Sequence, residues 1–411
     1  MTVTRPGQER SGQQFSRRPL PDGVVEVTGV LEARFDSLVE LKEGSLLANN
    51  GQLSSDGGKS WSETRSFGEG IEGTGLLRLK SGKLALTGNT IHFSEDEGKT
   101  WAQSAEVLPE VLAKDGHALF QALALSDTII QLSSGRLLHT SYLSFAGMHP
   151  ELHFEDVSSY GTWRGQRYQV EGHVHFPEMD LTLVTYSDDE GKSWRLAEGQ
   201  GGRMNTFMGW FDEGGFPNGY ANVTTFDEPS AAETSDGRVL LFGRSTVGRI
   251  VYTYSPDGGD TWSAVLPTEL ANSNSPARIR HIPQTGDLIC VWNQVSREEI
   301  RRGYRRGRLS AAISKDSGAS WGHFKTLELS QGLEDIDRIP PELPLKMVRA
   351  RDHVGQLPEY WAYFHYANIC FAKDKVYLMY PRGGPHFGVA ERNLKKQECV
   401  LRIYPLEWFY K

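Results

Sequence analysis

The sequence predicts an all-β protein, a six-bladed β-propeller of four-stranded antiparallel blades, and two internal repeats carry this prediction. The first repeat has the pattern S-x-D-x-G-x-[ST]-W, which we call the box motif. It occurs at residues 54–61, 94–101, 187–194, 255–262 and 314–321. The second repeat is an apolar segment, a polar turn and another apolar segment. Its turns lie at residues 42–45, 80–83, 133–136, 235–238, 284–287 and 372–375. Because the two repeats alternate, they predict six blades, the last of which lacks a box motif.

Each residue type of the box motif has a structural role in a hairpin. The aspartate can accept hydrogen bonds from turn amides, and the glycine can adopt positive φ. The tryptophan supplies a large apolar side chain that can pack between neighbouring sheets. One carboxylate per isolated turn provides too few oxygens for calcium. We therefore expect five hairpin turns rather than five metal sites.

The repeats also predict the domain organisation. They extend over most of the chain, so we expect one propeller domain over residues 21–411, preceded by a disordered segment at residues 1–20. The third blade has a much longer interval between its turn and its box motif than the first two. This predicts an insertion at about residues 140–180, rich in histidine and aromatic residues, that forms strands or a loop over one face.

Composition excludes several classes of function. The chain has 44 Lys and Arg against 52 Asp and Glu, a formal net charge of -8, and no block of like charges, so we expect no nucleic-acid partner. The first residues are polar and no long apolar stretch follows, so we expect a cytoplasmic protein without a membrane segment. The three cysteines have no metal-binding spacing, and we predict no metal or cofactor.

The box motifs resemble the Asp boxes of the sialidase (neuraminidase) superfamily, and the resemblance covers about residues 30–405. It implies a propeller whose boxes lie on outer turns and take no part in chemistry. It also implies a glycoside hydrolase that holds the carboxylate of its substrate with three arginines. Guanidinium groups suit that task because they are planar, permanently charged and match a carboxylate fork.

The resemblance assigns the first two arginines to specific segments. The segment RFDSL at residues 34–38 stands where the family has its first arginine, so Arg34 takes that place. The segment EPSAAETSDGRVLLFGR at residues 228–244 is similar to the family segment in which a glutamate leads a hairpin that ends in the second arginine. Glu228 and Arg244 match these two positions.

The third arginine falls in a crowded run. The segment RGRLSAAIS leads into the last box motif and offers Arg306 at the family position, with Arg305 and Arg308 as rivals. The segment HYANICFAKDKVYLMY at residues 365–380 has the shape of the strand that carries the sialidase tyrosine nucleophile, so Tyr366 takes that role.

The chemistry explains a tyrosine nucleophile. Sialic acid already carries a carboxylate at its anomeric carbon, and attack by a second carboxylate would bring two negative charges together. A phenol avoids this repulsion, but it is protonated near neutral pH and needs a neighbouring base. The resemblance implies that Glu228 is this base for Tyr366.

The general acid is the point at which the sequence departs from the family. Family members carry a free aspartate after the first arginine, whereas here the corresponding interval is filled by a hairpin. Asp36 is the nearest candidate because residues two apart share one face of a strand. His365 and Glu178 are alternatives.

We therefore expect an exo-acting, retaining glycoside hydrolase that acts on a terminal sialic acid or another acidic sugar. A glycosidase of the same fold with a different sugar specificity is one alternative. A carbohydrate-binding propeller without turnover is another, since one fold hosts many functions. A carbohydrate is the expected partner in each case.

Overall fold

The computed structural model describes most of the repeated part of the chain. Described are residues 19–28, 36–107, 113–114, 117–118, 120–123, 129–145, 160–163, 166–169, 181–197, 203–204, 206–207, 223–224, 226–245, 248–273, 275–301, 306–334, 340, 361–385 and 397–411. Residues 1–18 of the predicted disordered segment and most of the predicted insertion therefore lie outside the described residues. Within the insertion, β14 (Tyr160–Trp163) pairs with β15 (Gln166–Gln169).

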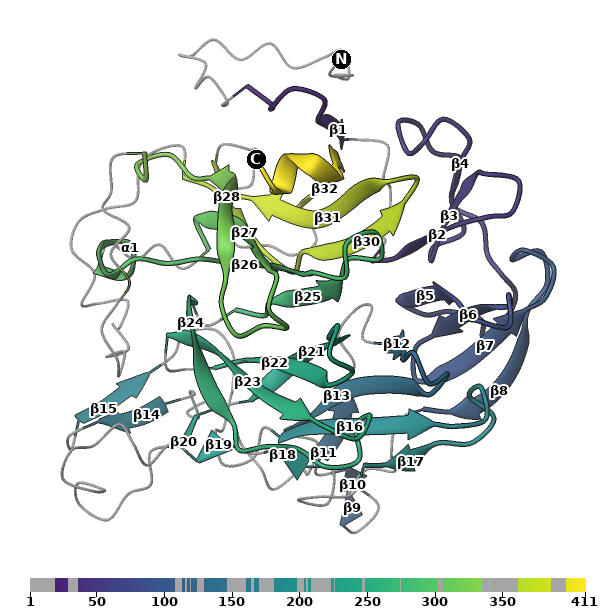
Figure 1. The fold of residues 1–411 in the computed structure, drawn as a ribbon, viewed down its shortest axis with the longest axis horizontal. Helices are drawn as coiled ribbons and strands as arrows, with labels where there is room; N and C mark the ends of the chain where they lie inside the picture. Colours follow the sequence, from purple (N-terminus) through teal and green to yellow (C-terminus); the bar gives the residue numbers. More distant parts are fainter. Residues whose placement is uncertain are drawn as a thin grey trace.

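Six antiparallel sheets follow one another around a ring in chain order, which confirms the predicted six-bladed propeller (Figure 1). Blade 1 contains β2 (Leu38–Glu40), β3 (Leu46–Ala48) and β4 (Leu53–Ser54). Blade 2 contains β5 (Gly75–Arg78), β6 (Leu84–Thr87), β7 (Thr90–Ser94) and β8 (Ala102–Glu106). Blade 3 contains β11 (Phe120–Leu123), β12 (Ile129–Gln131), β13 (Leu137–Phe145), β16 (Leu181–Ser187), β17 (Arg195–Leu196) and β18 (Arg203–Met204).

The second half of the ring is built in the same way. Blade 4 contains β21 (Asp227–Glu233), β22 (Val239–Arg244), β23 (Arg249–Ser255) and β24 (Leu266–Ala271). Blade 5 contains β25 (Arg278–His281), β26 (Leu288–Trp292), β27 (Arg308–Ser314) and β28 (Gly322–Leu329). Blade 6 contains β29 (Tyr363–Phe364), β30 (Asn368–Ala372), β31 (Lys375–Gly383), β32 (Glu398–Pro405) and β1 (Val25–Thr28).

Shorter elements accompany the blades. They are β9 (Ala113–Lys114), β10 (His117–Ala118), β19 (Thr206–Phe207), β20 (Val223–Thr224), the helix α1 (Arg297–Arg301) and the 3₁₀ helix η7 (Leu406–Phe409). The helix α1 has a capping box, in which Ser296 and Glu299 bond each other's backbone amides. No helix among the described residues is long and apolar enough to cross a membrane.

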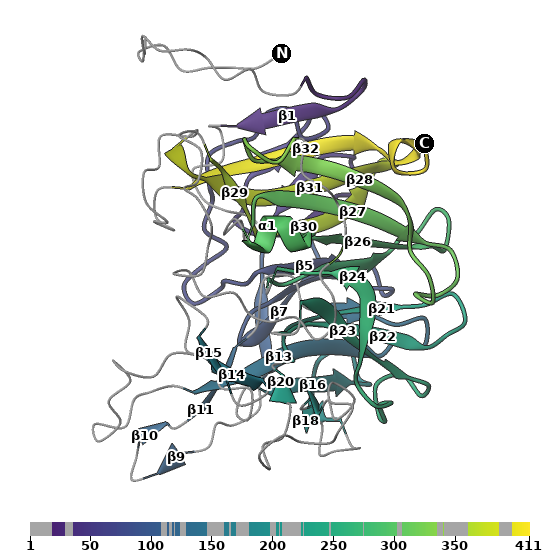
Figure 2. The same ribbon diagram turned by 90° about the vertical axis from the view of Figure 1, so that its left-hand side faces the viewer.

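Blade 6 joins the two ends of the described chain. Strand β1 pairs with β32, with Val25 opposite Ile403, and the two strands lie side by side in Figure 2. The outermost strand of the last blade therefore comes from the N-terminal part of the sequence. This explains the missing sixth box motif, because no hairpin turn joins the third and fourth strands of this blade.

Each junction between neighbouring blades has its own apolar core. Between blades 1 and 6, for example, Leu46 and Trp61 pack with Tyr377 and Leu401. The tryptophans of the other box motifs lie in the junction with the preceding blade in the same way. The box glycines face that blade too: a Cβ on Gly98, whose φ is +81°, would lie 2.6 Å from a methyl group of Leu47. The box motif thus joins one blade to the previous one.

Within the box turn, the aspartate bonds as its sequence position predicts. In the first motif Asp56 accepts hydrogen bonds from the backbone amides of Lys59 and Ser60 and from the hydroxyls of Ser54 and Ser60. The indole of Trp61 donates to the carbonyl of Gly58 at 2.9 Å. The turn is therefore closed by its own side chains.

Candidate active site

The strand pairing divides the molecule into two faces. In blade 4, β21 begins at Asp227, opposite Arg244 at the end of β22, and its other end, Glu233, pairs with Val239. We call the face with the starts of the inner strands the site face. The opposite face holds the first turns of the blades and the box motifs, and we call it the box face. Because β-strands rise about 3.3 Å per residue, the two ends of β21 lie roughly 20 Å apart.

A buried ion pair forms at the start of β21. Glu228 and Arg244 are only 4% and 3% exposed, and Arg244 Nη1 donates to Glu228 Oε2 at 2.9 Å. The register shifts between Asp227 and Ser230, and Glu228 has a φ of 46°, which is uncommon for a residue other than glycine. Burial alone lowers the pKa of Arg244, but the charges of Glu228 and Asp227 outweigh it and hold the pKa above its usual value.

Tyr366 reaches the same carboxylate from blade 6. Its hydroxyl donates to Glu228 Oε1 at 2.9 Å, across 138 positions of sequence. Like Glu228 it has positive φ, at 49°. Burial, and then the negative charge of Glu228, raise the pKa of Tyr366, whereas Arg306 and Arg244 lower it. The structure therefore places the Tyr366 hydroxyl within hydrogen-bond distance of Glu228, as the sequence predicts.

Arg306 lies beside this pair. Its guanidinium carbon is 5.2 Å from the centre of the Tyr366 ring, and its Nη1 is 3.0 Å from His365 Nδ1. The rival Arg308 instead donates to Glu299 at 2.8 Å in a fully buried pair that ties β27 to α1. Of the three predicted arginines and their rivals, Arg34 and Arg305 lie outside the described residues.

Asp36 stands on the site face at the start of blade 1. It is buried, and its Oδ1 accepts from Asn368 Nδ2 at 2.8 Å. Asn368 Oδ1 in turn accepts from Arg278 Nε at 2.8 Å, which fixes the orientation of the amide. This chain of bonds links blades 5, 6 and 1 and places Asp36 near the strand that follows Tyr366. Its role as the acid stays a prediction, and Glu178 lies outside the described residues.

A family model described as BNR repeat-like domain matches residues 79–378, which is well over half of the chain. The chain belongs to the BNR repeat-like domain family.

Solved structures similar to this BNR repeat-like protein include one of unknown function from Dyadobacter fermentans. It is 15% identical, with 93% of this chain and 99% of that chain covered and a TM-score of 0.50. An alpha-L-arabinanase from Penicillium chrysogenum in complex with arabinobiose is 13% identical, with 92% and 95% covered and a TM-score of 0.48.

A sialidase from Trypanosoma rangeli is 14% identical, with a TM-score of 0.47, and 93% of this chain matches 60% of that chain. Of these comparisons, the one with the Dyadobacter structure supports the fold, and none of them bears on the activity of this BNR repeat-like protein.

Sequence reasoning missed several residues that the propeller brings to the site. Tyr142 of β13 is one. Burial raises its pKa, and the charges of Glu228 and Asp227 raise it further, so it lies within electrostatic reach of the Tyr366 pair. Asp227, fully buried beside Glu228, and Asn368 are others. A lone polar residue in a strand has no spacing that marks it. Only its alternation with apolar neighbours could have indicated that Asn368 faces the axis.

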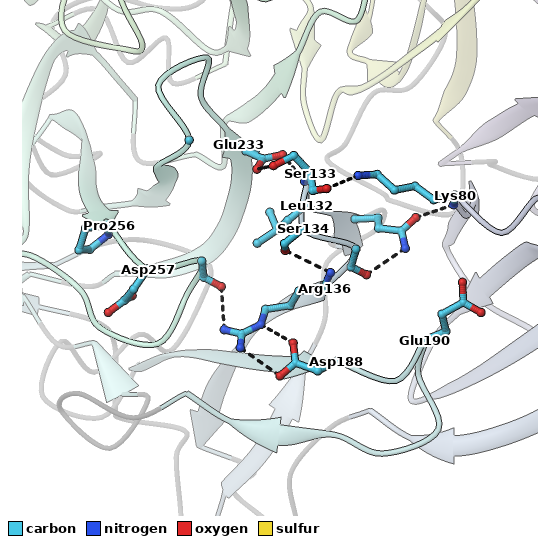
Figure 3. A pocket seen from close by; sticks show the side chains of 14 residues that line it. Lys80, Leu132, Ser133, Ser134, Arg136, Asp188, Glu190, Glu233, Pro256 and Asp257 are labelled. Carbon is cyan, nitrogen blue, oxygen red and sulfur yellow. Dashed lines mark hydrogen bonds and ion pairs between the residues drawn. The ribbon is translucent and has the colours of Figure 1, made fainter.

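A cavity of about 520 Å³ lies on the box face, among the turns of blades 2 to 4 (Figure 3). Figure 3 shows Arg136 pointing at Asp188, to which it donates two hydrogen bonds. Glu233 accepts from the amide and the hydroxyl of Ser133. Arg136 also pairs with Asp260 of blade 4, and the contact of Ser133 with Glu233 likewise joins blades 3 and 4. We therefore interpret the cavity as a structural junction between blades of the BNR repeat-like fold. Among the described residues, no group of His, Cys, Asp and Glu could hold a metal ion.

Proposed function

We propose that this BNR repeat-like protein is a retaining exo-glycoside hydrolase that acts on a terminal sialic acid or another acidic sugar, with Tyr366 as its nucleophile. The observation that carries the proposal is the 2.9 Å hydrogen bond from the Tyr366 hydroxyl to Glu228. A nucleophile within hydrogen-bond reach of a base that is itself oriented by a third group is the arrangement of covalent catalysis. Arg244 is that third group.

In the proposed first step, the phenolic oxygen of Tyr366 attacks the anomeric carbon and its proton passes to Glu228. The bond to the leaving oxygen breaks, and an acid protonates that oxygen. In the second step, water attacks the anomeric carbon and gives a proton to the conjugate base of the acid, the bond to Tyr366 breaks, and the phenolate regains its proton from Glu228. Two displacements at one carbon retain its configuration. The raised pKa of Tyr366 means that the phenol needs a base such as Glu228.

The cations of the site support an anionic substrate. Arg306 stands against the Tyr366 ring, and Arg244 stands beside Glu228. Both guanidinium groups are buried, where a charge interacts more strongly than in water. In the proposal these two groups and Arg34 bind the carboxylate of the sugar. A sugar bound in this way has its anomeric carbon close to Tyr366.

Asp36 is the proposed acid, and its role can be tested separately. An acid matters most when the leaving group is a poor one. We expect Asp36→Asn to slow the hydrolysis of alkyl sialosides on the order of 10²-fold or more, and that of aryl sialosides with acidic phenols much less. Equal losses on both substrates would assign the acid to another residue.

The proposal is tested by measuring the hydrolysis of an aryl sialoside and an aryl glucuronide by the wild type and by Tyr366→Phe. We expect Tyr366→Phe to lose about 10³-fold or more in kcat. Tyr410→Phe is a matched control, because Tyr410 donates a similar hydrogen bond, of 2.7 Å, to Asp287 on the box face. Unchanged activity of Tyr366→Phe would overturn the proposal.

A glycosidase that takes a neutral sugar is the second candidate. It is favoured by the fact that the charge of Arg244 is already balanced by Glu228. A panel of aryl glycosides separates the two candidates. Turnover of arabinosides or galactosides, with acidic glycosides left intact, would favour the second.

A further inference from the structure

Arg306 is held by the segment that carries Tyr366, and it is held at two points. The backbone amide of Phe364 donates to the carbonyl of Arg306 at 2.9 Å. The side chain of Arg306 bonds His365, the next residue, at 3.0 Å. The first contact ties the backbone of Arg306 to the segment that presents Tyr366, and the second ties its guanidinium to the same segment.

The chemistry of the two groups fixes the protonation of His365. A guanidinium has only donors, so Nδ1 of His365 must be the acceptor. A ring nitrogen accepts only when it carries no proton. The imidazole is therefore neutral, with its proton on Nε2.

Aromatic neighbours fix the direction of the His365 ring. His365 is 1% exposed, and its ring centroid is 5.4 Å from that of Tyr363 and 5.1 Å from that of Tyr366. Tyr363 is packed in turn on Trp361 at 5.6 Å. The backbone amide of His365 donates to the carbonyl of Pro381 in β31. These contacts leave His365 Nδ1 aimed at Arg306.

We propose that His365 is the positioning residue that holds Arg306 toward the anionic group of the substrate. The inference rests on the proposed function and deepens it. It assigns the recognition of the substrate anion to a pair, Arg306 and His365, that is mechanically joined to the nucleophile Tyr366. His365 itself touches no reacting atom in this scheme, so its loss affects substrate affinity more than the chemical step.

Three variants test the pair on the acidic glycoside that the wild type hydrolyses. In His365→Phe, Arg306 loses its acceptor, and we expect KM to rise roughly tenfold or more while kcat changes little. His365→Asn places an oxygen near the position of Nδ1, and we expect it to restore KM to within about threefold. His365→Gln places its amide near Nε2 and should not restore it. His281→Asn, at an exposed histidine on the box face, is the matched control.

Rescue by Asn but not by Gln supports the proposal. A KM for His365→Phe equal to that of the wild type overturns it, and so does a loss confined to kcat.

A second measurement is independent of turnover. Long-range proton–nitrogen correlation spectra of the wild type report which imidazole nitrogen carries the proton, and subtraction of the His365→Asn spectrum assigns the signal. We expect the Nε2–H tautomer at neutral pH. A proton on Nδ1 overturns the His365 proposal. If the tautomer is as expected but no acidic glycoside is hydrolysed, the proposed function fails and the pairing of Arg306 with His365 stands.

Discussion

Two tyrosine–carboxylate pairs of similar length stand at opposite faces of the propeller. Tyr366 donates to Glu228 at 2.9 Å on the site face, and Tyr410 donates to Asp287 at 2.7 Å on the box face. Asp287 and Tyr410 are each half-buried, and Asp287 lies in a regular turn of the repeat. Glu228 is buried and paired with Arg244. The hydrogen bond alone therefore does not mark a site.

Positive φ in residues other than glycine occurs on both faces of the propeller. On the box face, Glu97, Glu190 and Ser317 occupy the same position of the box motif, where the turn requires this conformation. The blade 6 turn at residues 373–374 and His323, near the start of β28, have positive φ as well. On the site face, Glu228 has positive φ at the register shift of β21, and Tyr366 has it between β29 and β30, outside any box motif or hairpin turn. Strained residues of this kind cluster at functional sites, because the surrounding structure must hold them there.

The largest expected effect comes from changing the carboxylate that accepts the tyrosine hydrogen bond on the site face, compared with the same change on the box face. We expect Glu228→Gln to reduce kcat by roughly 10² to 10⁴, since the phenol would lose its proton acceptor. Asp287→Asn, the matching change on the box face, should leave kcat unaltered. Steady-state hydrolysis of the same acidic glycoside checks both. Equal losses in the two variants would remove the distinction between the faces.

Blade 6 contains a buried cluster of charged residues that allows a test of whether a buried ion pair by itself indicates a catalytic role. Glu26 of β1 binds Arg382 and Arg402, both nearly fully buried, and so ties the N-terminal strand to the blade. Burial alone raises the pKa of Glu26, but the charges of Arg382 and Arg402 outweigh it and lower the pKa to about 2. We expect Glu26→Gln to lose about 2–3 kcal/mol of stability, because it breaks a buried pair, and to keep its kcat.

The pH dependence of this cluster follows from the lowered pKa. The unfolded carboxyl titrates near 4.5 and the folded one near 2, so its contribution is complete above pH 4.5 and is lost as pH falls toward 2. The free energy of unfolding in urea should therefore fall more steeply in the wild type than in Glu26→Gln between these pH values. Parallel curves would show that Glu26 does not hold β1 in place.

A smaller effect is expected from Arg306→Lys. Lysine keeps the positive charge but lacks the planar fork that both His365 and a substrate carboxylate engage. We expect KM for the acidic glycoside to rise about tenfold, with a much smaller change in kcat. Arg308→Lys, two residues further along, should lower stability and leave KM unchanged, because Arg308 binds Glu299 instead. The reverse pattern would assign substrate binding to Arg308.

The smallest effect is expected in a box motif. Asp56→Asn keeps one oxygen for the turn amides but weakens the bonds to Ser54 and Ser60. Because the turn is exposed, we expect a small fall in melting temperature and unchanged hydrolysis. A large loss of activity would show that the box face takes part in catalysis.

The fold could be predicted because its signal is local and repeated. Each box motif closes a turn with its own Asp, Gly and Trp, so eight residues of sequence are enough to recognise it. The closure of the ring gave no such signal. Strand β1 is four residues long and pairs with β32 more than 370 positions away, and its sequence contains no motif that predicts this pairing.

The site could be predicted only in part, because its residues occur once each and are not part of a repeat. Glu228, Arg244, Arg306 and Tyr366 were assigned from a family resemblance, and the described residues bring these four together. Tyr142 and Asn368 were missed because each is one polar residue within an ordinary strand. Their place at the site comes from the ring of blades, which brings strands that are distant in sequence close together.

The central claim, that Tyr366 is the nucleophile, is tested most directly by trapping. A 2,3-difluoro derivative of sialic acid carries a fluoride leaving group, and its second fluorine slows the hydrolysis of the enzyme adduct. After incubation and digestion, mass spectrometry should find the sugar attached to Tyr366 in the wild type and no adduct in Tyr366→Phe. An adduct on another residue, or one that persists in Tyr366→Phe, would contradict this account.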